Sequence, residues 1–150
     1  MKDYVAYNHK LFSRWALIYD GFEIILSSVR KKITQEINPA NKSVLDVATG
    51  TGSLAIALSL NAKEVVGIDL SSKMLDVASK KRTNDNLSFL QMDASEMSFD
   101  DNQFDIVTIS LGLHDMPLEI RTSVLEEAKR VLKKTGSSIF WNTTCLKTSL

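Results

Sequence analysis

Hydrophobic residues recur along the chain with two different spacings. From Phe22 to Ile37 they return every three to four positions, which is typical of an amphipathic helix. Several of the apolar runs that follow are too short for a helix and predict buried strands. The pattern predicts helices at 22–37, 53–60, 73–81 and from 117 to a stop at Gly136, and strands at 43–47, 64–68, 87–90, 104–109 and 137–141.

The alternation of strands with helices predicts an α/β fold. Strands that are apolar on both faces are typical of a mostly parallel sheet with helices on each side. We therefore expect a doubly wound, Rossmann-like sheet in residues 41–150 that ends after its fifth strand. A helical arm or lid in residues 1–40 precedes it, and the two form one structural domain. Ligands of such sheets bind beyond the carboxyl ends of the strands.

Composition narrows the classes of function. The 150 residues carry 18 Lys and Arg against 18 Asp and Glu, and this zero net charge argues against a protein held on nucleic acid by phosphate contacts. The single cysteine excludes an internal disulfide and a cysteine-rich zinc site, and it favours a reducing compartment. No apolar run approaches the ~20 residues of a membrane span. We expect a cytoplasmic protein that acts on a small molecule and holds no metal.

Two glycines follow the first predicted strand. Gly50 and Gly52 lie between that strand and a helix, where glycine lets the chain turn sharply and lets a ligand approach the backbone. Asp69 follows the second strand, where a carboxylate can accept hydrogen bonds from both hydroxyls of a ribose. A tight turn and a helix-capping acid would explain the same residues singly. Their combination favours a ligand that contains a nucleoside.

Two classes of cofactor fit this loop. The run from Gly50 to Ala55 matches the dinucleotide fingerprint G-x-G-x-x-G/A, so an NAD-binding oxidoreductase is one alternative. Asp46 argues against it, because a negative charge is unfavourable beside a pyrophosphate but suits an ammonium group or a sulfonium. Asp93 follows the third strand, where a carboxylate can accept a hydrogen bond from an adenine amino group.

Five segments together resemble the class I S-adenosylmethionine-dependent methyltransferases, notably the branch of ubiquinone and menaquinone biosynthesis methyltransferases (methyltransferase domain type 11). They are VLDVATGTG at 44–52, VGIDLS at 66–71, QMDA at 91–94, FDIV at 104–107 and RVLKKTG at 130–136. The resemblance runs from about Phe12 to Phe140. Ala48 stands where many relatives have glycine, and the 134–136 segment replaces a common Pro-Gly-Gly turn.

The resemblance implies S-adenosylmethionine as the cofactor and in-line methyl transfer to a small-molecule acceptor. It also implies the residues that would hold the cofactor. They are Tyr19 in the arm, Asp46, Ala48, Gly50 and Gly52 near the methionine part, Asp69 at the ribose, Leu70 and Met74 near the adenine, Asp93 and Ala94 at the adenine edge, and Ser110 and Leu111 beside the sulfonium. A truncated protein that binds the cofactor without turnover is a further alternative.

A catalytic base is needed only if the acceptor must lose a proton. His114, after the fourth strand, is the candidate, although packing beneath a loop would also explain a histidine there. Six of the 11 aromatic residues lie in the first 22 positions, where they would form a lid over an acceptor pocket or pack an extra helix on the core.

The fifth predicted strand carries no proline and no charge between Ser137 and Trp141. An unguarded apolar strand at a sheet edge tends to pair with another chain. We expect a homo-oligomer through this edge, or cover of the edge by residues 142–150.

Overall fold

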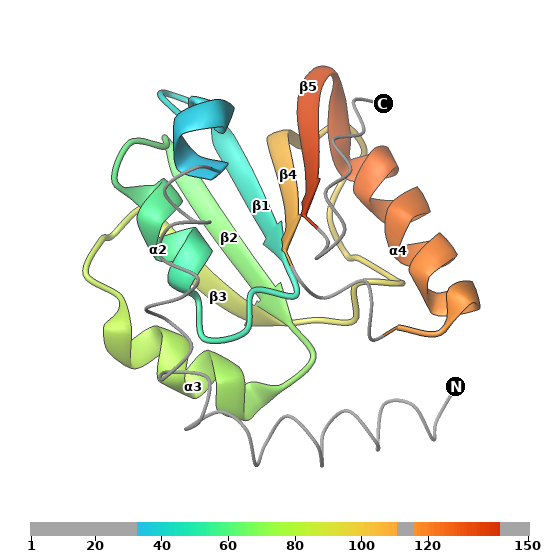
Figure 1. The fold of residues 1–150 in the computed structure, drawn as a ribbon, viewed down its shortest axis with the longest axis horizontal. Coiled ribbons are helices and arrows are strands. Elements are labelled where there is room, and N and C mark those ends of the chain that lie inside the picture. The colour runs from blue at the N-terminus through green and yellow to red at the C-terminus, as the bar shows by residue number, and fades with distance from the viewer. Residues whose placement is uncertain (1–32, 111–115, 142–150) are drawn as a thin grey trace.

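The structure, a computed structural model, describes residues 33–110 and 116–141 (Figure 1). Its strands are β1 (Ser43–Val47), β2 (Glu64–Asp69), β3 (Leu87–Gln91), β4 (Phe104–Ser110) and β5 (Leu132–Trp141), and its helices are α2 (Ser53–Ser59), α3 (Ser72–Lys81) and α4 (Leu118–Val131). The strands form one sheet in the order β3-β2-β1-β4-β5, and every neighbouring pair is parallel. The structure therefore confirms the doubly wound α/β fold.

The direction of winding reverses between β1 and β4. The chain runs outward from β1 through β2 to β3, returns to β4 on the other side of β1, and continues outward to β5. The α2 and α3 helices lie toward the β3 edge and α4 lies toward the β5 edge (Figure 1). Because all strands are parallel, their carboxyl ends share one edge of the sheet, and the β1–β4 junction is where a doubly wound fold offers a ligand site.

Two hydrophobic clusters cover the two faces of the sheet. On one face, Leu45 and Val47 of β1 pack with Val124, Ala128 and other residues of α4. On the other, Val44 packs with the buried residues of α2. Adjacent residues of β1 thus point into different cores, which explains why the strand is apolar at nearly every position.

The boundary between α4 and β5 differs from the prediction. The apolar spacing predicts a helix that stops at Gly136, but α4 ends at Val131, and Leu132 is already extended (φ −78°, ψ 131°). Leu132 pairs with Phe104 of β4, and the Lys133 ammonium lies 2.8 Å from an Asp105 carboxylate oxygen. Contacts with β4 therefore draw this segment into the sheet, and the prediction that Gly136 ends the helix is wrong.

The helix expected over residues 22–37 is described only at its end. Residues 33–37 are helical, and Ile33 and Ile37 are buried in the α2-side core. The rest of the expected arm, with its aromatic residues, lies outside the described residues. In the ranges that are described, we find no helix long and apolar enough to cross a membrane.

Candidate functional site

The loop between β1 and α2 has a left-handed backbone at alternate positions. The φ angles are 54° at Ala48, 57° at Gly50 and 76° at Gly52. The Thr49 N–H donates to the Ile68 carbonyl at 2.9 Å, which holds the loop against the end of β2. A Cβ on Gly50 would meet no atom within 4 Å, so the backbone is open to a ligand at that point.

Asp69 holds this loop to the start of α3. One carboxylate oxygen accepts the Gly50 N–H at 2.8 Å, and the other accepts the Ser71 N–H at 2.9 Å. Burial raises the pKa of Asp69, while these amide donors act in the opposite direction. A carboxylate has about four acceptor positions, so both oxygens retain capacity for further donors such as ribose hydroxyls.

Asp46 lies beneath the loop rather than on its surface. Its side chain is fully buried and accepts hydrogen bonds of 2.7 Å from the hydroxyls of Thr49 and of Thr108 on β4. Burial raises its pKa from 3.8 to about 6, and the two hydroxyl donors limit the rise. Asp46 therefore ties β1 to β4 at the reversal point.

Phe89 on β3 is a site residue that the sequence analysis missed. A Cβ on Gly52 would lie 2.6 Å from its ring, and a Cβ on Gly67 would lie 2.7 Å from it. The ring thus lies directly against both glycines and supports the loop from below. Gly67 and Phe89 are register partners on neighbouring strands, and a mid-strand glycine followed by an aromatic residue in the next strand was the available signal.

The ends of β2 and β3 bring the predicted adenosine residues to one edge. The Met92 N–H donates to the Asp69 carbonyl at 3.1 Å, and the Gln91 side-chain amide donates to the Leu70 carbonyl at 3.0 Å. Asp93 follows and is exposed, with one carboxylate oxygen accepting the N–H and the hydroxyl of Ser95 at 2.9 and 2.7 Å.

The remaining predicted residues divide into two groups. Leu70 and Ala94 are half-buried, Met74 on α3 is buried, and Ser110 is the last residue of β4, at the same sheet edge as the glycine loop. Tyr19, Leu111 and His114 lie outside the described residues. Within the described ranges, no group of three or more His, Cys, Asp or Glu side chains could hold a metal ion.

Fold and site together define a Rossmann-like protein with a glycine loop after β1 and an acid at the end of β2, a class that binds nucleoside-containing cofactors. A family model described as a methyltransferase domain matches residues 44–136, which include the loop, Asp69 and Asp93. The chain belongs to the class I S-adenosylmethionine-dependent methyltransferase family.

Curated relatives point to one branch of this family. The demethylmenaquinone methyltransferase of Staphylococcus carnosus (strain TM300) is 36% identical over 152 residues and matches 94% of this chain. The enzyme of the same name from Thermotoga maritima is 40% identical over 137 residues and matches 85% of it. The chain spans only 60% and 57% of the length of these two relatives.

Solved structures agree with the fold. A protein of Bacillus halodurans described as a methyltransferase is 36% identical, with a TM-score of 0.68 over 75% of this chain and 50% of its own. A methyltransferase solved in complex with the Haloferax volcanii activator Trm112 is 27% identical, with a TM-score of 0.78 over 86% of this chain and 58% of its own. These matches support neither the oxidoreductase nor the non-catalytic alternative.

Proposed function

We propose that this chain binds S-adenosylmethionine and transfers its methyl group to a small-molecule acceptor. The observation that carries the proposal is the position of Asp69, which bridges an open glycine loop and the first turn of α3 with both carboxylate oxygens. The sulfonium is already a good leaving group. The protein therefore acts mainly by aligning donor and acceptor, which lowers the activation free energy by roughly 7–11 kcal/mol in favourable cases.

The proposed cofactor site follows the carboxyl edge of the sheet. Asp69 accepts the ribose hydroxyls, and Asp93 with Ala94 recognises the adenine edge. Asp46 favours the cationic part of the cofactor from beneath the loop, because its buried carboxylate lies in a medium of low dielectric constant. The other residues that we assign to the cofactor are Tyr19, Ala48, Gly50, Gly52, Leu70, Met74, Ser110 and Leu111.

The acceptor side is the second part of the proposal. The name of the curated relatives makes demethylmenaquinone the first acceptor to test. His114, in the segment after β4, is our candidate base. His114→Asn should lower turnover and leave cofactor affinity unchanged, and unchanged turnover with a true acceptor would exclude that role.

The location of the protein, the role of its N-terminal arm and its self-association also belong to the proposal. The single cysteine supports a cytoplasmic location. The aromatic-rich arm of residues 1–40 is proposed as a lid over the cofactor. The outermost position of β5 in the described sheet supports self-association through that strand.

Titration calorimetry with S-adenosylhomocysteine and NADH tests the cofactor assignment. We expect the first to bind and raise the melting temperature. Asp69→Asn should weaken it at least tenfold, because a hydrogen bond to a charged group contributes about 1.5–3 kcal/mol. Asp76→Asn, on the exposed face of α3, is the matched control and should bind normally. Tight binding of NADH with no response to S-adenosylhomocysteine would overturn the assignment.

A further inference from the structure

The segment between β3 and β4 has no regular structure of its own. It spans residues 92–103, which contain neither helix nor strand, yet it must pass from the outer edge of the sheet to the far side of β1. Figure 1 shows it in yellow, running beneath the sheet toward α4. Its backbone polar groups therefore need partners from another element.

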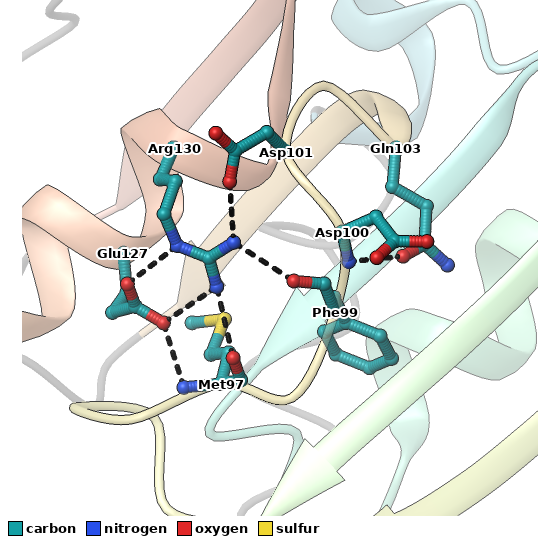
Figure 2. Close-up of polar contacts among 7 residues, drawn as sticks. All are labelled: Met97, Phe99, Asp100, Asp101, Gln103, Glu127 and Arg130. Atoms are coloured by element: carbon teal, nitrogen blue, oxygen red, sulfur yellow. Dashed lines mark hydrogen bonds and ion pairs between the residues drawn. The ribbon is translucent and has the colours of Figure 1, made fainter.

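Arg130 and Glu127, one turn apart on α4, supply those partners (Figure 2). The Glu127 carboxylate accepts the Met97 N–H at 2.7 Å. Two nitrogens of the Arg130 guanidinium donate to the carbonyls of Met97 and Phe99, both at 2.8 Å. Hydrogen bonds from side chains of one helix thus take the place of the strand-to-strand hydrogen bonds that this segment lacks.

The guanidinium is saturated by these contacts. Its Nε and Nη2 donate to the two oxygens of Glu127 at 2.7 and 2.9 Å, a two-point pair that fixes the plane of the group. The Nη1 atom also donates to Asp101 at 2.8 Å. Arg130 lowers the pKa of Glu127, so the carboxylate stays ionised near neutral pH. A point charge such as an ammonium group could not make this set of bonds.

The other end of the segment is fixed to β2. Met92 donates to the Asp69 carbonyl, and from there the chain folds back on itself, since the Ser95 N–H bonds the Asp93 carboxylate and the Glu96 N–H bonds the Asp93 carbonyl at 3.2 Å. Met97 follows at once, with its side chain buried. The exposed Asp93 therefore sits in a short turn held at one end by β2 and at the other by α4.

We propose that Arg130 and Glu127 are positioning residues that hold the turn of Asp93 and Ala94 in place for recognition of adenine. The inference rests on the proposed function, because it takes this turn as the adenine site. Neither residue is among those that we assign to the cofactor. They act through the Met97 peptide groups, so their loss should release one end of the turn and leave the ribose contact at Asp69 intact.

The affinities for two nucleoside compounds distinguish a positioning role of Arg130 from a general effect on stability. S-adenosylhomocysteine carries the adenine amino group, and S-inosylhomocysteine carries a carbonyl oxygen in its place. We expect Arg130→Met and Arg130→Lys to weaken the adenosine compound about tenfold, the value of one hydrogen bond, and the inosine compound much less. Lys129→Met, at an exposed neighbouring position on α4, should change neither affinity.

Calorimetry of the full chain measures both affinities. Circular dichroism checks the fold of each variant. An unchanged preference for adenosine over inosine in a folded Arg130→Lys variant would overturn the positioning role and leave the proposed function standing. Failure of the unmodified chain to bind S-adenosylhomocysteine would overturn both. Amide exchange at Ser95 and Met97, faster in the variants than in the unmodified chain, provides a readout that needs no ligand.

Discussion

Phe89 restricts which residues can stand at positions 52 and 67. Its ring lies where the Cβ atoms of Gly52 and Gly67 would stand, at 2.6 and 2.7 Å. The two glycines differ in backbone, since Gly52 has φ 76° and Gly67 is an ordinary strand residue. At Gly67 the ring is thus the main obstacle to a side chain, with the Thr49 hydroxyl next at 3.0 Å, whereas at Gly52 the backbone excludes one as well.

Gly67→Ala should therefore destabilise the protein by about 1–3 kcal/mol through overpacking against the ring. Phe89→Leu frees space, so the double variant should be more stable than the sum of the single changes predicts, by at least ~0.5 kcal/mol. Urea unfolding of the four proteins measures this coupling.

Gly52→Ala combined with Phe89→Leu is the control. Its rescue should be smaller, because removal of the ring does not relieve the positive φ of Gly52. Additive effects at Gly67 would show that the ring is not what excludes a side chain there.

Asp46 should impose a pH dependence on stability. Its pKa is about 6 in the folded protein against 3.8 for an unperturbed carboxyl, so between these values the folded state binds more protons than the unfolded state. The free energy of unfolding should then fall as pH rises from about 4 to about 6, by roughly 3 kcal/mol at most. Asp46→Asn should remove most of this slope in urea unfolding across that range, and Asp69, whose pKa is also raised, should leave a smaller slope of the same sign.

Asp105 provides a comparison of opposite sign. Hydrogen bonds from Lys133 and Ser43 lower its pKa to about 2, so its contribution is present above pH 4 and is lost as pH falls through 2. Asp105→Asn should therefore lower the free energy of unfolding above pH 4, flatten its fall below pH 4, and leave the slope between pH 4 and 6 unchanged. Equal slopes for Asp46→Asn and the unmodified protein between pH 4 and 6 would contradict the burial of an ionisable Asp46.

Among the helices, α3 shows how a local signal sets the start of an element. Ser71 accepts the Met74 N–H at 3.4 Å and adopts the extended backbone of an N-cap. Its own N–H donates to Asp69, so the same residue begins the helix and contacts the site acid.

Ser71→Ala should lower the free energy of unfolding by about 1 kcal/mol, because the cap loses its acceptor while the backbone donor to Asp69 remains. Chemical denaturation measures this loss. Ser79→Ala, at an exposed position of the same helix, should stay within about ±0.5 kcal/mol. Equal effects of the two changes would refute the capping role.

The boundary between α4 and β5 shows the opposite case. Val131 and Leu132 fit one helical stripe, but pairing of Leu132 with β4 and the ion pair of Lys133 with Asp105 favour the extended form. A helical pattern contains no information about a partner that lies some 30 residues earlier in the chain, so the strand begins earlier than the apolar spacing predicts.

At the scale of the whole molecule, the feature that bears on self-association is the sheet edge formed by β5. The β5 strand is outermost in the described sheet, and we expect copies of the chain to associate through it. Light scattering should give a mass that rises with protein concentration. Thr135→Lys, a charge added at an exposed position of β5, should shift the protein toward monomer, whereas Ser88→Lys at the opposite edge should not. A constant monomer mass would contradict this interface.

Much of the candidate site could be predicted from the sequence because its parts follow strand ends. Gly50, Asp69 and Asp93 could each be placed from a local run of residues and the rule that parallel strands share an edge. Phe89 and Arg130 could not be assigned roles in the same way, because their partners are distant in the chain. The burial of Asp46 was equally hidden, since it depends on Thr108 from a strand about 60 residues away.

The sequence by itself therefore determined the fold class, the bounds of β1 to β4 to within one residue, and the glycine loop with its acid, because hydrophobic period and turn chemistry are local properties. Only the tertiary structure decided that Asp46 lies beneath the loop, that Phe89 lies against two glycines, and that Arg130 clamps the crossover to α4. Each of these three features depends on contacts that form only once the layers have packed. The whole sheet, rather than any one segment of it, sets those contacts.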